Sequence, residues 1–193
     1  MILRRLFLAF LLCLAAAPAL AQPAPPVRVR IETSEGAIVV EVDLARAPVT
    51  GANFLRYVDQ RRYDGATFYR AMPGGANRGL VQAGVDHQRR LPPIAHEPTS
   101  RTGLSHVDGA VSIARDAPGT ATADITIMIG DMSYLDAGGV DPDGYAVFAR
   151  VVEGMDTIRR IHAAPTSPTE GEGAMRGQML SPRIRIISAR RVN

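Results

Sequence analysis

The sequence contains no lysine, and its only cysteine is Cys13, near the N-terminus. A phosphate-binding loop needs a lysine followed by Ser or Thr after its glycines, so a chain without lysine excludes nucleotide binding of that kind. The cysteine lies in a segment that we expect to be removed. The mature protein is therefore expected to have neither a thiol nor a disulfide.

The first 21 residues have the pattern of a secretory signal peptide. Arg4 and Arg5 precede an apolar run over residues 6–17, and the small residues of Ala19-Leu20-Ala21 suit a cleavage site. The run is shorter than the roughly 20 residues that a membrane-spanning helix needs. We expect a signal peptide over residues 1–21 that is cleaved, which leaves a mature chain without a membrane-spanning helix. The alternative is that the segment stays uncleaved and anchors the protein in the membrane.

Charge is nearly balanced once the signal peptide is set aside. It carries two of the 22 basic residues and none of the 19 acidic ones, which leaves a formal charge of +1. The arginines are spread along the chain, so the pattern does not indicate nucleic-acid binding. The signal and the arginine-only composition predict a periplasmic protein, with secretion as the alternative, and the lack of cysteine suits such an oxidising compartment.

The chain after the signal divides into a short leader and one domain. Residues 22–26, Gln-Pro-Ala-Pro-Pro, are expected to be extended and disordered. Residues 27–193 have the length of a single domain. Apolar and polar residues alternate over 27–31, and residues 38–42 are again strand-like after the turn at 34–36, which predicts an opening hairpin.

Two helices and several short strands are expected in the rest of the domain. Pro48 suits a first helical turn, and apolar residues at helical spacing follow to about residue 61. A second helix is predicted over residues 155–161, and a loop over 163–179. Further strands are predicted over residues 67–70, 80–83, 110–114, 125–129, 145–151 and 184–192. Because closure removes unpaired edges, many short strands favour a closed antiparallel barrel whose ends the two helices cover.

Two motifs resemble those of a known family. The segment 67–74, TFYRAMPG, followed by QAG at 82–84, resembles the catalytic edge of a cyclophilin, and residues 144–156 resemble the segment that closes its barrel. The resemblance covers about residues 27–192. It implies a mainly-β fold, a closed eight-stranded antiparallel barrel capped by two helices. It also implies a peptidyl-prolyl cis-trans isomerase, monomeric and without cofactor, that acts on X-Pro segments of unfolded or exported proteins.

The resemblance also assigns roles to individual residues. Arg70 matches the arginine that donates to the prolyl nitrogen, a task that suits a guanidinium because it stays charged and presents fixed, planar donors. Gln82 matches the glutamine that holds the substrate backbone. The other implied substrate-binding residues are Leu80, Ala114, Asp124, Thr126, Leu135, Tyr145 and Phe148.

The sequence departs from the family at the proline pocket. Gly79 and Thr126 stand where the family usually has phenylalanine, and Asp124 stands for a glutamine. The pocket floor is therefore expected to be smaller and more polar, which predicts weak turnover. The alternative is a non-catalytic module that binds proline-containing peptides as a chaperone. We also hypothesise that the Asp124 carboxylate pairs with Arg70 and competes with substrate.

Other candidate sites are weaker. The four histidines show no metal-ligand spacing, and we expect them at the surface or in loops; they are His87, His96, His106 and His162. A Ser-His-Asp triad can be assembled from Ser105 or Ser112, but no Gly-x-Ser-x-Gly elbow is present. Residues 141–144, Asp-Pro-Asp-Gly, suit a tight turn better than a calcium site. No metal site is predicted.

Overall fold

The computed structural model describes residues 26–192. The expected signal peptide and nearly all of the proline-rich leader lie outside the described residues, so both stay predictions. Within residues 26–192, no helix is long and apolar enough to cross a membrane.

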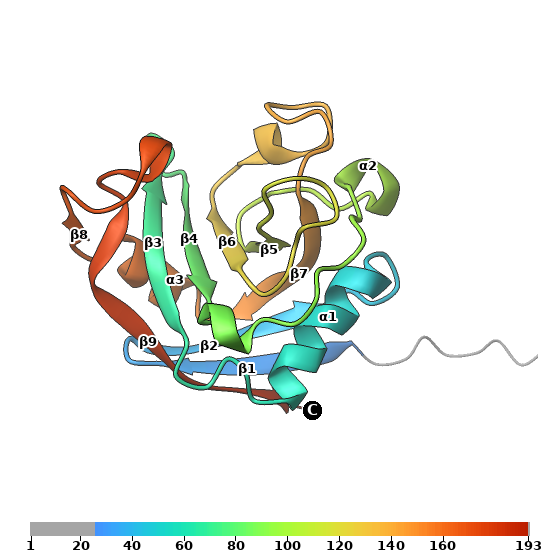
Figure 1. Cartoon of the computed structure of the whole chain (residues 1–193), viewed down its shortest axis with the longest axis horizontal. Coiled ribbons are helices and arrows are strands. Elements are labelled where there is room, and N and C mark those ends of the chain that lie inside the picture. Colours follow the sequence, from blue (N-terminus) through green and yellow to red (C-terminus); the bar gives the residue numbers. More distant parts are fainter. Residues whose placement is uncertain (1–25, 193) are drawn as a thin grey trace, which may run out of the picture.

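Eight strands form one closed antiparallel barrel (Figure 1). In sequence order they are β1 Val27–Thr33, β2 Gly36–Val42, β3 Thr67–Pro73, β4 Gly79–Gly84, β5 Ala110–Ile113, β6 Ile125–Ile129, β7 Ala146–Glu153 and β9 Met179–Val192. Around the barrel the order is β1-β2-β7-β5-β6-β4-β3-β9, and β9 pairs with β1 to close the ring. The two-residue strand β8, Thr166–Ser167, pairs with the start of β9. The predicted eight-stranded barrel is confirmed.

The barrel interior holds the main hydrophobic core, because alternate residues of a strand point to the same face. In β1, Val29 and Ile31 are buried, while Arg30 between them is exposed. Phe148 of β7 meets Phe54 inside the barrel, with ring centroids 5.2 Å apart. The apolar alternation in the sequence thus becomes one continuous buried face.

Two main helices pack on the barrel, as the sequence predicted: α1, Pro48–Asp59, and α3, Met155–His162. Figure 1 shows them on different sides of the sheet. Phe54 and Tyr57 of α1 and Ile158 and Ile161 of α3 are fully buried. The shorter helices, which the sequence did not reveal, are η1 His87–Arg89, α2 Thr99–Thr102, η2 Ser133–Leu135 and η3 Gly173–Met175.

The first turn of α1 is capped from a distant loop. Ala47 stands before the helix and has no side-chain acceptor. Glu97 accepts hydrogen bonds from the backbone N–H groups of Val49 at 3.1 Å and Thr50 at 2.6 Å, and from the Thr50 hydroxyl at 2.7 Å. The Glu97 side chain is 2% exposed, and Arg101 lies 3.4 Å away. Because first-turn N–H groups lack intrahelical acceptors, this carboxylate ties the loop before α2 to α1.

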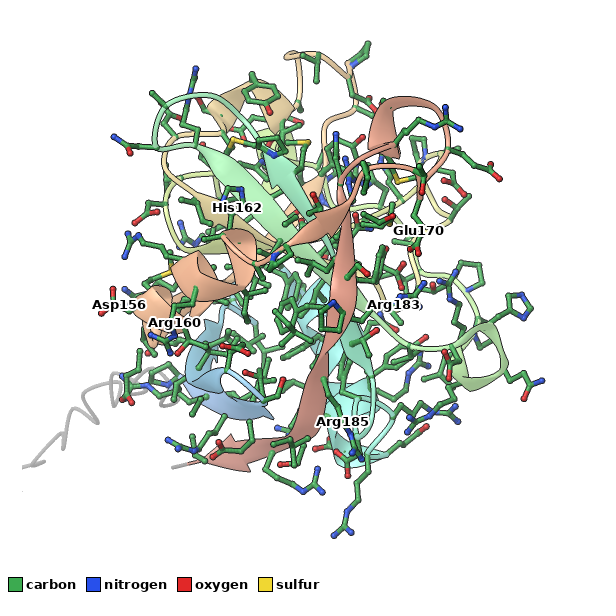
Figure 2. All side chains as sticks on the ribbon, turned by 90° about the vertical axis from the view of Figure 1, so that its left-hand side faces the viewer. Asp156, Arg160, His162, Glu170, Arg183 and Arg185 are labelled. Atoms are coloured by element: carbon green, nitrogen blue, oxygen red, sulfur yellow. The ribbon has the colours of Figure 1, made fainter. Side chains whose placement is uncertain are left out.

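The last strand starts earlier than the apolar pattern indicated. β9 begins at Met179 rather than at residue 184, and the predicted loop over 163–179 contains β8 and η3. Pairing with β8 extends the strand, since Thr166 lies opposite Leu180. In Figure 2, Arg183 and Arg185 follow one another along β9. They alternate with the buried Ile184 and Ile186, whereas Ser181 and Pro182 before them are both exposed and break the alternation, which is why the pattern placed the start too late.

Candidate active site

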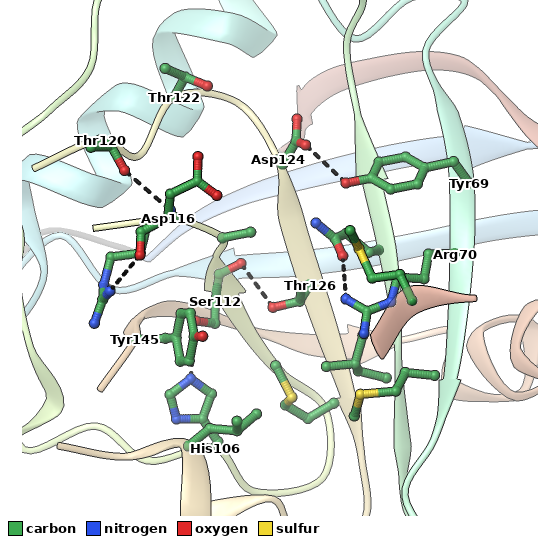
Figure 3. A pocket seen from close by; sticks show the side chains of 18 of the residues that line it. Tyr69, Arg70, His106, Ser112, Asp116, Thr120, Thr122, Asp124, Thr126 and Tyr145 are labelled. Atoms are coloured by element: carbon green, nitrogen blue, oxygen red, sulfur yellow. Dashed lines mark hydrogen bonds between the residues drawn. The ribbon is translucent and has the colours of Figure 1, made fainter. Parts of the chain in front are cut away.

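A cavity of about 520 Å³ opens on the outer face of the barrel, where β3, β4, β6 and β5 are neighbours (Figure 3). Eight of the nine site residues expected from the sequence line it: Arg70, Leu80, Gln82, Ala114, Asp124, Thr126, Leu135 and Tyr145. The ninth, Phe148, does not. The barrel therefore gathers residues that are far apart in the sequence into one site.

One row of polar side chains crosses four strands at the cavity. Arg70 lies opposite Gln82, Gln82 lies opposite Thr126, and Thr126 lies opposite Ser112. Directly opposed residues of an antiparallel pair place their side chains on the same face. Strand register thus aligns a cation, an amide and two hydroxyls.

A β-bulge brings two consecutive side chains to the cavity. The pairing of β3 with β4 shifts between Phe68, opposite Ala83, and Arg70, opposite Gln82, so that Tyr69 is the extra residue. Neighbours in a regular strand face opposite sides, but a bulge re-aims one of them. Tyr69 and Arg70 both line the cavity as a result, while Phe68 is fully buried in the core.

Two glutamines hold the guanidinium of Arg70. Its Nη1 donates to Oε1 of Gln82 at 3.0 Å, and its Nε donates to Oε1 of Gln178 at 2.8 Å. Partial burial lowers the pKa of Arg70, which nearby tyrosines oppose, but an arginine keeps its charge at any working pH. Arg70 and Gln82 are therefore in direct contact. Sequence reasoning missed Gln178, since it stands in the segment that was expected to be a loop.

Asp124 pairs with residues other than Arg70. The hydroxyl of Tyr69 donates to its Oδ2 at 2.9 Å, and Nη2 of Arg90 lies 3.3 Å from both carboxylate oxygens. Burial raises the pKa of Asp124, which Tyr69 and Arg90 partly oppose. The hypothesis that Asp124 pairs with Arg70 was wrong, because the bulge turns Tyr69 toward the carboxylate and the two glutamines occupy Arg70.

Apolar side chains form a recess within the same cavity; they are Met72, Leu80, Met128 and Leu135. Met72 lies opposite Leu80, and Leu80 lies opposite Met128, so three of them form a second row beside the polar one. At Gly79, a Cβ would collide with Nε2 of His162 from α3. The imidazole of His162 therefore occupies the space that a larger side chain at position 79 would need, and His162 does not line the cavity.

Phe148 lies in the barrel core, so its placement in the pocket was wrong. It is fully buried and packs on Phe54. Its neighbour Val147 lies opposite Ser112 and therefore shares the cavity side of the sheet. The pairing of β7 with β5 shifts here, because Val111 lies opposite Ala149, so Phe148 is the extra residue of a bulge and its ring lies in the core. An apolar residue assigned one position off thus changes faces.

Arg115 and Tyr145 form another wall of the cavity. The guanidinium carbon of Arg115 lies 4.9 Å from the centroid of the Tyr145 ring, and Nη2 donates to Asp141 at 2.9 Å. Nε of Arg115 is the one buried side-chain nitrogen or oxygen without a hydrogen-bond partner in the described part of the chain. The preceding residue, Ala114, donates its N–H to the carbonyl of Asp124 at 2.8 Å, which continues the pairing of β5 with β6 toward the cavity.

His106 lies in a loop, as expected, but it is fully buried rather than at the surface. Its Nδ1 lies 2.5 Å from Oδ1 of Asp136, and its Nε2 lies 3.0 Å from Oγ of Ser112. Burial lowers the pKa of His106, an effect that Asp136 opposes. The Ser-His-Asp combination that the sequence allowed is therefore assembled in space, and the sequence carried no signal for this burial.

The remaining histidines serve in backbone contacts or lie at the surface. Nε2 of His96 lies 3.0 Å from the carbonyl of Asp143, and Nε2 of His162 lies 3.0 Å from that of Met72. In the part of the chain that the structure describes, no group of three or more His, Cys, Asp or Glu side chains could hold a metal ion.

Known proteins share both the sequence pattern and the fold. Residues 28–190 match the family model described as cyclophilin type peptidyl-prolyl cis-trans isomerase/CLD. A peptidyl-prolyl cis-trans isomerase of Acinetobacter baylyi is 33% identical over 141 residues, which cover 72% of this chain and 73% of that protein. Peptidyl-prolyl cis-trans isomerase cyp18 of Streptomyces antibioticus is 35% identical over 151 residues, which cover 74% of this chain and 87% of the relative.

A solved structure supports the fold independently. The crystal structure of a cyclophilin type peptidyl-prolyl cis-trans isomerase from Cryptosporidium parvum aligns with a TM-score of 0.69 at 17% identity, covering 88% of this chain and 99% of that one. At this identity the likeness shows the fold alone. The family model, in contrast, spans most of the chain and includes the row from Arg70 to Ser112. The chain therefore belongs to the cyclophilin-type peptidyl-prolyl cis-trans isomerase family.

Proposed function

We propose that the protein isomerises X-Pro bonds with Arg70 as the donor to the prolyl nitrogen. The observation that carries this proposal is a fixed guanidinium beside an apolar recess. Gln178 accepts from Nε and Gln82 accepts one hydrogen of Nη1, so Nη2 keeps its donors for a substrate as far as the described residues are concerned. A donor fixed in advance needs no reorganisation during the reaction.

Rotation about an X-Pro bond needs no catalytic group other than this donor. Amide resonance sets a barrier of about 18–20 kcal/mol to rotation, while cis and trans X-Pro forms differ by only about 0.5–1 kcal/mol. As the bond twists, the prolyl nitrogen becomes pyramidal and its lone pair can accept a hydrogen bond. A donor at that atom favours the twisted state over both planar states, which is what accelerates the reaction. No nucleophile or proton transfer is needed.

The rest of the cavity would hold the peptide. Its proline ring suits the recess formed by Met72, Leu80, Met128 and Leu135, where apolar surface leaves water at about 25 cal/mol per Å². Oε1 of Gln82 accepts from Arg70, so its amide nitrogen remains to donate to a peptide carbonyl. Ala114 also lines the cavity, and its backbone would contact the residue before proline.

We expect modest turnover because Thr126 leaves part of the recess without an aromatic ring. Its hydroxyl lies 3.4 Å from the carbonyl of Ser112, which it can reach as a donor. An aromatic at this position would add about 1–3 kcal/mol of contact with the proline ring. Thr126→Phe should therefore bind an X-Pro peptide about tenfold more tightly, as measured by calorimetry. An unchanged affinity would contradict this placement of the ring.

The rotation itself is tested by two-dimensional NMR exchange on an Ala-X-Pro-Phe peptide. Wild-type protein should accelerate exchange, and Arg70→Ala should reduce the acceleration by about 100-fold, the effect of removing one donor to a transition state. Arg183→Ala is the matched control, because this arginine is exposed on β9 (Figure 2) and does not line the cavity.

The same spectra test a second candidate function, a non-catalytic peptide-binding chaperone module. The hydroxyl of Thr126 and the carboxylate of Asp124 favour it, since both make the cavity more polar than proline binding needs. Peptide signals that shift without faster exchange would support this module and overturn the isomerase proposal.

The proposed clients are X-Pro segments of exported proteins in the periplasm. The support is the signal-peptide pattern of residues 1–21 and a nearly balanced, cysteine-free remainder. Cell fractionation with intact-mass measurement should find a chain that begins at Gln22 in the periplasmic fraction. Full-length protein in the cytoplasm would contradict export, and a mature chain in the medium would indicate secretion.

A further inference from the structure

His106 stands at a junction of several walls of the cavity. It lies in the loop between α2 and β5, with Nδ1 2.5 Å from Asp136 and Nε2 3.0 Å from Ser112. Its backbone N–H donates to the same Asp136 oxygen at 3.1 Å, and its carbonyl accepts the N–H of Met132 at 2.8 Å. The imidazole also meets the Tyr145 ring edge to face, with centroids 6.4 Å apart.

The hydrogen-bond partners assign the tautomer of His106. A carboxylate only accepts hydrogen bonds, so Nδ1 carries the proton and donates to Asp136. Nε2 is then an acceptor, and the hydroxyl of Ser112 donates to it. Ser105 donates its hydroxyl to the other oxygen of Asp136. Both ring nitrogens of the buried imidazole are therefore satisfied, the condition under which a polar network makes a structure rigid.

The order of Ser112, His106 and Asp136 is that of a hydrolase triad, but the surroundings do not suit acyl transfer. Ser112 is 1% exposed and His106 is 0% exposed, so a substrate carbonyl cannot approach the hydroxyl. The backbone of Ser112 is paired with both β6 and β7. This pairing occupies N–H groups that would have to stabilise an oxyanion.

The network instead joins the parts of the cavity that surround the apolar recess, and Figure 3 shows His106 beside Tyr145 on the same side of the cavity as Ser112. Asp136 directly follows Leu135, which lines the recess. Ser112 belongs to β5, and Tyr145 comes directly before β7. One imidazole thus contacts the loop that carries Leu135, the strand β5 that leads to Ala114, and the ring of Tyr145.

We propose that His106 is a positioning residue, which holds Leu135 and Tyr145 against β5 and thereby sets how tightly the cavity grips the proline ring. This role rests on the proposed function of the cavity as an isomerase site. Because the ring is gripped in the planar and twisted states alike, loss of the network should raise KM and leave kcat nearly unchanged. Loss of folded protein would do the opposite, lowering apparent kcat at constant KM.

The network should also respond to acid. Asp136 is the charged group that touches the imidazole, and Arg115 packs on the same Tyr145 ring. Burial lowers the pKa of His106 and outweighs the opposing effect of Asp136. The neutral network is therefore intact above the ordinary histidine pKa of about 6.5. Protonation of Nε2 removes the acceptor for Ser112, so KM should rise as pH falls through the lowered pKa.

The experiment measures kcat, KM and peptide Kd from about pH 8 to about pH 5, the range around the ordinary histidine pKa, for three variants and the wild type. His106→Leu removes both hydrogen bonds and should raise KM and Kd about tenfold, the effect of one net hydrogen bond. His106→Gln keeps a donor and an acceptor and does not titrate, so it should restore KM to within about threefold of wild type and abolish the rise in acid. His87→Leu, exposed on η1, is the control and should behave as wild type.

Two further readouts keep the proposal falsifiable if His106→Leu does not fold. Nitrogen-15 NMR of the wild-type imidazole should show a protonated Nδ1 and an unprotonated Nε2, and the reverse tautomer would overturn the network. Labelling of Ser112 by a fluorophosphonate would overturn it too, in favour of acyl transfer. Unchanged KM and Kd in a folded His106→Leu variant would refute the positioning role while Arg70-dependent turnover stands. A wild type without turnover would refute the isomerase function, and peptide Kd would still test the network.

Discussion

Glu97 stabilises α1 from 47 residues away in the sequence, and its replacement tests the fold quantitatively. A hydrogen bond to a charged group contributes about 1.5–3 kcal/mol, and a carboxylate at a helix N-terminus gains up to about 2 kcal/mol from the helix dipole. These contributions overlap, because one carboxylate makes all of them. We expect Glu97→Ala to lower the free energy of unfolding by about 3 kcal/mol and Glu97→Gln by roughly half of that, since the amide keeps one acceptor but lacks the charge.

The assay is equilibrium unfolding in urea followed by circular dichroism. With a slope of about 2 kcal/mol per molar urea, the midpoint for Glu97→Ala should fall by roughly 1.5 M. Glu170→Ala is the control, because this residue is exposed beside η3 and should leave the midpoint unchanged. A midpoint shift for Glu97→Ala as small as that of the control would refute the argument that this buried carboxylate caps α1.

Two further predictions concern the core and the closure of the barrel. Phe148→Leu should lower the free energy of unfolding by about 2 kcal/mol, since it loses contact with Phe54, while peptide KM stays constant; a raised KM with unchanged stability would return Phe148 to the pocket. Asp64 accepts two hydrogen bonds of 2.7 Å from Arg190, which lower its pKa, so its contribution of about 0.5 kcal/mol is fully present above the unfolded pKa near 3.9 and is lost as pH falls through the lower pKa of the folded state. Asp64→Asn should therefore flatten the acid limb of a plot of unfolding free energy against pH, and an unaltered limb would show that the pair contributes nothing.

The fold was predictable because its signals are local. Alternation such as that of Val29, Arg30 and Ile31 reports a strand with one buried face, and Pro48 before an apolar helical pattern reports the start of α1. The length of β9 was not predictable in this way. Its first residues are held by pairing with β8 across a long connection, which depends on tertiary structure rather than on neighbouring residues.

The sequence by itself determined the barrel class, both main helices and the neighbouring strand positions of Arg70 and Gln82, because these follow from periodicity and from motifs within a few residues. Tertiary structure decided the rest of the site. Gln178 is 108 residues from Arg70 in the sequence, and Asp136 is 30 residues from His106. No local sequence pattern predicts contacts between residues so far apart in the chain. Pairing of β3 with β9 sets the first contact, and burial of one loop against another sets the second. The face on which a side chain lies depends on register, so a single bulge decides what enters the site.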